Sequence, residues 1–303
     1  MSMEFIIIVL GALAAAILFL SSAYVYWRWR YGPPGPESIP ILAYHKVGTR
    51  FELGGTWVTP ARFRKQMEYL KARGYTAVTL SDAAEMMRDG RSRQGRYVCI
   101  TFDDAYGDLY AHAWPVLREL GFAATVYAVT AFAGRDNTWD INWGGRIFPH
   151  LSWEQMREMQ DGGVEFGSHT VSHYDLRFLG DDALDFELSV SKREMEARLG
   201  KPVTSLSYPF GRYDARVRAA AIRAGYTNAC SLCPRSRNSL TDPYALRRCG
   251  VYVTDVMWDF RNKVDQTSRW FWIQDLFCRA VNFCSGGTAL VKRWRGYRPA
   301  VGE

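Results

Sequence analysis

Residues 97–104 have the sequence Tyr-Val-Cys-Ile-Thr-Phe-Asp-Asp. An apolar, β-branched run of this kind predicts a buried strand. The strand ends in two adjacent acids, Asp103 and Asp104, and a buried acid costs free energy unless it is paired or binds a cation. Successive side chains of an extended segment point to opposite sides, so we expect one carboxylate to ligate a metal and the other to face the substrate.

Two histidines follow a second strand-like segment. His169 and His173 are four positions apart, a spacing that places both imidazoles on one face of a helical turn. Two histidines and one carboxylate leave coordination positions open for water and substrate, which suits a catalytic metal. Either motif alone would be weak evidence. Together, each at the end of a predicted strand, they predict a metal site.

Three motifs occur in a fixed order: Thr-Phe-Asp-Asp at 101–104, Ser-His-Thr-Val-Ser-His at 168–173 and Ser-Tyr-Pro-Phe-Gly at 207–211. In this order they resemble the metal-dependent polysaccharide deacetylases with the NodB homology domain, carbohydrate esterase family 4. Leu-Ala-Tyr-His-Lys-Val at 42–47 is similar to the branch that contains the poly-N-acetylglucosamine deacetylases. The resemblance implies hydrolysis of an N-acetyl group from an amino sugar.

The resemblance also implies a role for each matched residue. Asp103 matches the general base, and Asp104, His169 and His173 match the ligands of a divalent metal, for which zinc is the default. The backbone N–H of Phe210 matches a donor to the oxyanion. The alternatives are an N-cap or ion-pair role for Asp103, an ordinary buried or surface pair for the histidines, and a simple strand-ending turn around Phe210.

The sequence departs from the family pattern at two places. Ser207 stands where many members have an arginine that orients the base, and Arg248 is our candidate for its substitute, with Arg247 in reserve. The late histidine that serves as the acid in many members is missing, since no histidine follows His173. His45 matches the branch in which an early Tyr-His supplies the acid. The alternatives are a solvated basic patch for the arginines and a buried, backbone-bonded imidazole for His45.

Strand and helix patterns alternate over residues 39–260, which we assign to one α/β domain. Helix start signals include Thr59-Pro60, Ser81-Asp82 and the capping-box pattern that begins at Ser152. Alternation of this kind implies a parallel sheet, either open or closed as a barrel. The resembled family implies a distorted (β/α) barrel, in many members an incomplete one with fewer than eight strands, with active residues at strand ends.

The N-terminal segment, residues 1–30, is interpreted as a transmembrane anchor. Residues 5–27 carry no charge, and about 20 apolar residues suffice to cross a bilayer. A cleavable signal peptide is the alternative, but Glu4 and a long apolar run disfavour it. Arg28 and Arg30 place the domain in the cytoplasm by the positive-inside rule, whereas the family mostly works outside it. We therefore expect a single-pass membrane protein of unresolved orientation.

The remaining segments are a Pro/Gly spacer at residues 31–38 and a basic, aromatic tail at residues 261–303. The tail is either a membrane-interfacial amphipathic segment or a helix packed on the barrel. The net charge of +7 is not accompanied by a nucleic-acid-binding motif, so an anionic membrane surface explains it better than nucleic acid does. Cys230 and Cys233 have zinc-ligand spacing, but a second such pair is missing.

Two functional hypotheses follow. The first is a membrane-anchored, metal-dependent hydrolase that removes N-acetyl groups from a polysaccharide or from a lipid-linked amino sugar. The second is a catalytically silent, membrane-tethered glycan-binding module, which the altered position 207 and the missing late histidine motivate. A glycoside hydrolase lacks support, because adjacent acids at 103 and 104 cannot flank a scissile bond.

Overall fold

The structure, a computed structural model, describes residues 3–32, 35, 38–52, 54–139, 145–232 and 242–284. Over these residues, nine strands form one parallel sheet in the order β10-β9-β8-β7-β6-β5-β1-β11, with β4 paired to β5 beside that path. The strands are β1 (Ile41–Tyr44), β4 (Thr76–Val78), β5 (Tyr97–Phe102), β6 (Ala124–Ala128), β7 (Val164–Ser168), β8 (Ser205–Ser207), β9 (Asn228–Ser231), β10 (Leu246–Arg247) and β11 (Cys249–Gly250).

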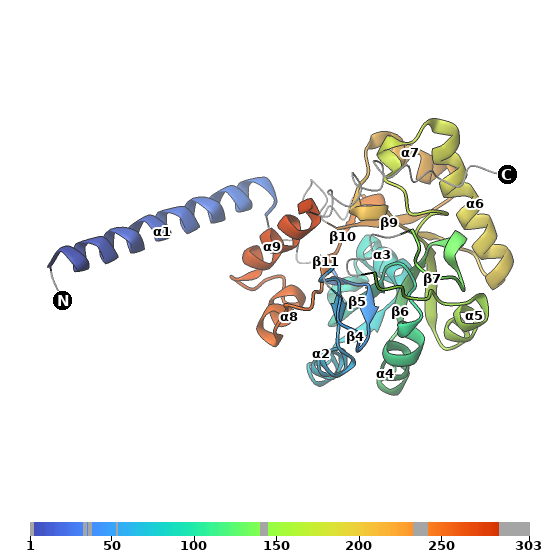
Figure 1. Cartoon of the computed structure of the whole chain (residues 1–303), viewed down its shortest axis with the longest axis horizontal. Coiled ribbons are helices and arrows are strands. Elements are labelled where there is room, and N and C mark those ends of the chain that lie inside the picture. The colour runs from blue at the N-terminus through green and yellow to red at the C-terminus, as the bar shows by residue number, and fades with distance from the viewer. Residues whose placement is uncertain are drawn as a thin grey trace.

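The two edges of this sheet are joined by the chain itself. β10 pairs with β9 at one edge and β11 pairs with β1 at the other, yet Arg248 is the only residue between β10 and β11. The sheet therefore curls into a nearly closed barrel with its seam at Arg248 (Figure 1). The predicted α/β barrel is confirmed in this form.

The alternation of side chains along β5 determines which of them point into the interior of the barrel. Val98, Ile100 and Phe102 belong to the main hydrophobic core. Cys99 belongs to a second cluster that also contains residues of β1, β6, β9 and β10, and Thr101 is fully buried. Because the period of a strand is two, Asp103 continues the row of Cys99 and Thr101.

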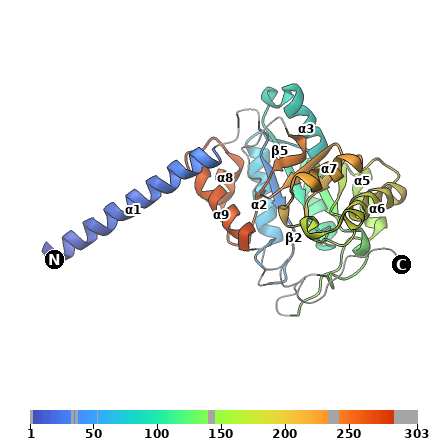
Figure 2. The ribbon, with the colours of Figure 1, turned by 90° about the horizontal axis from the view of Figure 1, so that it is seen from above.

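The helices cover the outside of the sheet (Figures 1 and 2). They are α2 (Pro60–Ala72), α3 (Leu80–Asp89), α4 (Trp114–Leu120), α5 (Trp153–Asp161), α6 (Asp181–Leu199) and α7 (Ala215–Arg223). Thr59 caps α2, and Ser152 with Gln155 forms the predicted capping box of α5. The prediction for α3 was two residues late: Thr79 is the cap, and Ser81 instead bonds to Glu165.

The predicted membrane anchor is wrong. Residues 3–30 do form one helix, α1 (Met3–Arg30), but among the described residues no helix is both long and apolar enough to cross a membrane. Trp27, near the end of this helix, is buried against the domain, where its Nε1 donates to Asp275 at 2.7 Å and its ring lies 6.3 Å from that of Phe271. The predicted single-pass placement and membrane partnership are withdrawn with the anchor.

The described part of the tail packs on the barrel. It begins within α8 (Met257–Val264) and contains α9 (Phe271–Cys284), whose buried face includes Phe271 and Cys278. Figure 1 shows both helices between the barrel and α1. The residues outside the described part of the chain include 285–303, half of the 31–38 spacer, and Cys233 of the Cys230–Cys233 pair.

Candidate active site

The three predicted metal ligands come together at the carboxyl ends of β5 and β7. One ligand atom from each of Asp104, His169 and His173 lies within 4.8 Å of the other two. The Oδ1 atom of Asp104 is 3.6 Å from the Nε2 atom of each histidine. All three residues are buried. This donor set of two imidazoles and one carboxylate fits a divalent metal ion.

The tautomer of His169 supports this assignment. Its Nδ1 lies 2.7 Å from the backbone carbonyl of Ser207, which can only accept, so Nδ1 donates. Nε2 then carries a lone pair directed toward Asp104 and His173. A second hydrogen bond of this kind is a regular feature of metal-ligating histidines, because it fixes the ring orientation.

Backbone strain is concentrated at this site. Among the described residues, five that are not glycine have a positive φ: Asp104, Ala105, Thr170, His173 and Phe210. All lie in or beside the three motifs, and left-handed conformations in side-chain-bearing residues are unfavourable. At a φ of +68°, Asp104 has left the extended conformation of β5. The segment 169–173 forms a non-helical turn, whereas the spacing of the two histidines predicted a helical one.

Asp103 has different partners from Asp104, as expected. Its two carboxylate oxygens accept from Nη1 and Nη2 of Arg248, both at 2.8 Å. Arg248 also donates to Thr101 and Ser207, and the Ser207 hydroxyl donates to Asp103 at 3.1 Å. Burial raises the pKa of Asp103, but the charge of Arg248 and its hydrogen bonds to the carboxylate hold that pKa well below its usual value.

The structure distinguishes the two candidate arginines. Arg248 is fully buried and lies 5.5 Å above the ring of Tyr127. Arg247 is paired instead with Asp275 of α9. Neighbouring residues at the seam point to opposite sides, so only Arg248 reaches Asp103.

His45 and Phe210 also lie at this end of the barrel. His45 is close enough to Asp103, Arg248 and His169 for their charges to act on it, and loss of solvent lowers its pKa to about 4. Its imidazole is therefore neutral at neutral pH. Phe210 lies in the turn Pro209–Gly211 after β8, and its ring centroid is 4.8 Å from that of His173.

Two residues at the site were missed by sequence reasoning. Nδ1 of His150 lies 2.6 Å from the backbone carbonyl of Asp104, and Nε2 accepts from Trp139 at 3.0 Å. The Trp139 ring lies 4.4 Å from that of His173. Both belong to the connection between β6 and α5, which carries no motif and has no periodicity, so no local signal could have identified them.

Glu187 was missed for a similar reason. It lies in the middle of the amphipathic helix α6, where an acid is normally solvent-exposed, yet it is fully buried. Its carboxylate accepts from the backbone N–H groups of Val171 and Ser172 at 2.8 and 2.9 Å and from the Ser172 hydroxyl. It thereby holds the turn between the two histidines.

Comparison with known proteins identifies relatives of this chain. Residues 90–229 match the sequence profile of the family described as polysaccharide deacetylase. The chain is 31% identical over 216 residues to YxkH of Bacillus subtilis (strain 168), a protein assigned to the polysaccharide deacetylases, with 71% of this chain and 72% of the relative covered.

Two further proteins extend the comparison. A poly-beta-1,6-N-acetyl-D-glucosamine N-deacetylase of Staphylococcus epidermidis is 29% identical over 218 residues, which cover 67% of this chain and 70% of that protein. The solved structure of the Streptococcus pyogenes deacetylase PplD in complex with acetate has a TM-score of 0.65 and 23% identity, with 75% of this chain and 97% of that chain covered. At that identity the structural match bears on the fold alone.

Proposed function

The chain belongs to the polysaccharide deacetylase family, and from this membership and the geometry of the site we propose that it is a metal-dependent hydrolase that removes N-acetyl groups from the amino sugars of a glycan. The observation that carries the proposal is the position of the Asp103–Arg248 pair directly beside the cluster of Asp104, His169 and His173. The relative from Staphylococcus epidermidis favours poly-N-acetylglucosamine as the glycan. A lipid-linked amino sugar is the other substrate of the same class.

A divalent metal, for which zinc is our first candidate, would be held by Asp104, His169 and His173 and would polarise the amide carbonyl and acidify a water molecule. The remaining chemistry falls to side chains and backbone. The N–H of Phe210 would donate to the oxyanion that develops when water adds to the carbonyl.

We assign proton transfer to Asp103 and His45. Asp103 would take a proton from the attacking water, and its pairing with Arg248 keeps it ionised and oriented for that step. The low pKa of Asp103 makes it ready to pass this proton on. His45, neutral before the reaction, would receive the proton and deliver it to the nitrogen of the amine as the C–N bond breaks.

A catalytically silent glycan-binding module remains the alternative function. The departure at position 207 and the missing late histidine motivated it, but the bonds from Arg248 to both Asp103 and Ser207 support Arg248 as the substitute. A binding module has no need for a buried base held in this way.

The test uses the full chain, stripped with chelator and reloaded with zinc. Acetate release is measured from β-1,6-linked N-acetylglucosamine oligomers. We expect zinc to restore release, and Asp103→Asn to lower kcat by at least about 10²–10⁴-fold while zinc affinity is kept. Asp182→Asn, an exposed acid of α6, is the control. A folded, zinc-loaded protein that releases no acetyl group from any N-acetylated glycan would refute the proposal.

A further inference from the structure

A pocket of about 270 Å³ opens beside the catalytic site. It is formed by β2 (Lys46–Val47), β3 (Trp57–Val58), the segment that follows β5, the π-helical turn Leu109–Ala113 and residues 148–149. Lys46 directly follows His45, and Tyr106 comes two residues after Asp104. The lining of the pocket thus includes chain neighbours of both the candidate acid and a candidate metal ligand.

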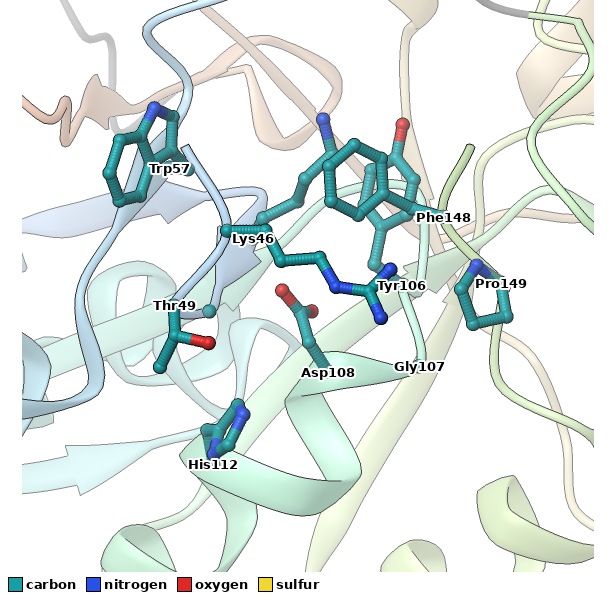
Figure 3. A pocket seen from close by; sticks show the side chains of 11 residues that line it. Lys46, Thr49, Trp57, Tyr106, Gly107, Asp108, His112, Phe148 and Pro149 are labelled. Carbon is teal, nitrogen blue, oxygen red and sulfur yellow. The ribbon is translucent and has the colours of Figure 1, made fainter. Parts of the chain in front are cut away.

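The walls of the pocket are aromatic. Trp57, Tyr106 and Phe148 line it (Figure 3). The Nζ atom of Lys46 lies 4.5 Å from the ring centre of Tyr106 and 4.7 Å from that of Phe148, which holds the two rings in place. Tyr106 in turn stacks on His150, with ring centroids 4.9 Å apart. One wall of the pocket is thus continuous with the residues that surround the metal cluster.

Charged side chains also line the pocket, namely Lys46, Arg50 and Asp108. The ammonium group of Lys46 is paired with Glu52 at 2.6 Å, which makes it a poor site for a free anion. Asp108 lies opposite, and Figure 3 shows its carboxyl group pointing into the space between Thr49 and Tyr106. Its Oδ1 atom is buried and finds no hydrogen-bond partner within the described part of the chain.

From these features we propose that the pocket binds a second sugar ring of the glycan, next to the sugar that is deacetylated. A pyranose has apolar faces that pack on aromatic rings and hydroxyl groups that bond to a carboxyl oxygen, and such mixed apolar and polar linings are typical of small-molecule sites. The volume is near the lower end of the roughly 300–1,000 Å³ of such sites, so it suits one ring. The inference rests on the proposed function, because it assumes a glycan in the adjoining site.

Two further observations support this assignment. Burial and the charge of Glu52 raise the pKa of Asp108 to about 7, against the opposing effect of Lys46, so the group can exchange hydrogen bonds with hydroxyls as acceptor or donor. Gly48 leaves room for it, because a Cβ atom at that position would lie 2.9 Å from Oδ2 of Asp108. The backbone approaches the carboxyl group without filling the pocket.

The test compares the N-acetylglucosamine monomer with its β-1,6-linked tetramer. In the zinc-loaded full chain, we expect Trp57→Ala and Asp108→Asn each to lower kcat/KM for the tetramer about tenfold, equivalent to ~1.4 kcal/mol, and to change it for the monomer less than about twofold. Trp258→Ala, an exposed tryptophan of α8, is the control. An equal loss for both substrates, or no loss for the tetramer, would overturn the assignment. Asp108→Asn keeps the test decisive if Trp57→Ala fails to fold.

A binding measurement separates this inference from the proposed function. If the wild-type protein releases no acetate from either substrate, these oligomers are not substrates of the proposed reaction, and tetramer binding to zinc-loaded Asp103→Asn protein is measured by calorimetry instead. A tenfold weaker binding when Trp57→Ala is added supports the second sugar site. Unchanged binding, or no binding of the tetramer by either protein, refutes it.

Discussion

At the scale of single residues, we explain the departure at position 207 by Arg248, which lies between β10 and β11 and donates to both Asp103 and Ser207. Ser207 cannot orient Asp103 by charge, and Arg248 supplies that charge from the seam of the barrel. Its planar fork matches both oxygens of the carboxylate, which a lysine could not do. The serine that takes the place of an arginine in β8 leaves space for the guanidinium and bonds to it.

Removal of one partner of the buried Asp103–Arg248 pair should strongly destabilise the protein. We expect Arg248→Met to lower the free energy of unfolding by about 3–5 kcal/mol, because Asp103 would remain buried without a counter-charge. Adding Asp103→Asn should recover part of this loss. Urea unfolding of the two single variants and the double variant measures the coupling.

The matched control is the exposed pair of Arg223 and Asp185. Arg223→Met should cost less than about 1 kcal/mol. If Arg248→Met is no more destabilising than this surface variant, Asp103 does not depend on its partner for burial and our interpretation of the pair is wrong.

At the scale of elements, helix α6 supports the turn that carries both histidines. Glu187 accepts three hydrogen bonds from Val171 and Ser172, between two residues of positive φ, Thr170 and His173. A buried carboxylate is costly by itself, and burial raises the pKa of Glu187. Its hydrogen bonds offset that cost only while the turn keeps its conformation.

We therefore expect Glu187→Gln to weaken zinc binding by about 10–100-fold, the usual effect of losing a group that supports metal ligands. An amide has one accepting oxygen in place of two, so the turn would lose part of its support. Zinc affinity is measured by competition with a chromogenic chelator. Asp182→Asn on the same helix is the control, and equal affinities of the two variants would show that α6 does not position the ligands.

At the scale of the whole molecule, the cluster of Asp104, His169 and His173 joins the ends of β5 and β7, and the Asp103–Arg248 pair joins β5 to the seam. The seam is supported from outside by α9, since Arg247 pairs with Asp275, which also accepts from Trp27 of α1. Both terminal segments thus contact the strand pair that carries Arg248. Helices α1 and α9 therefore support the seam beside the Asp103–Arg248 pair.

Metal removal should be visible as a loss of global stability. With free zinc at about 100 times its dissociation constant, binding adds ~2.7 kcal/mol, so chelation should lower Tm by roughly 5–10 °C for a domain of this size. Differential scanning calorimetry with and without chelator measures the change. His169→Ala should unfold at the same temperature in both conditions, whereas a wild-type Tm that is insensitive to chelator would contradict the metal site.

The sequence by itself predicted the α/β barrel, the motif residues and the candidate metal cluster of Asp104, His169 and His173. These depend on local patterns: the period of two along residues 97–103, the capping residues and the short motifs at strand ends. Even where the backbone differed from expectation, as in the turn at 169–173, the residue types still specified the chemistry.

Only the tertiary structure decided which arginine pairs with Asp103 and that Glu187 and His150 support the candidate site. It also placed the pocket at Trp57 and Asp108 near that site and packed Trp27 on the domain. Each of these depends on contacts between residues far apart in the chain, such as Asp103 with Arg248 and Trp27 with Asp275. Local patterns carry no information about such contacts, because closure of the sheet and packing of the helices choose the partners.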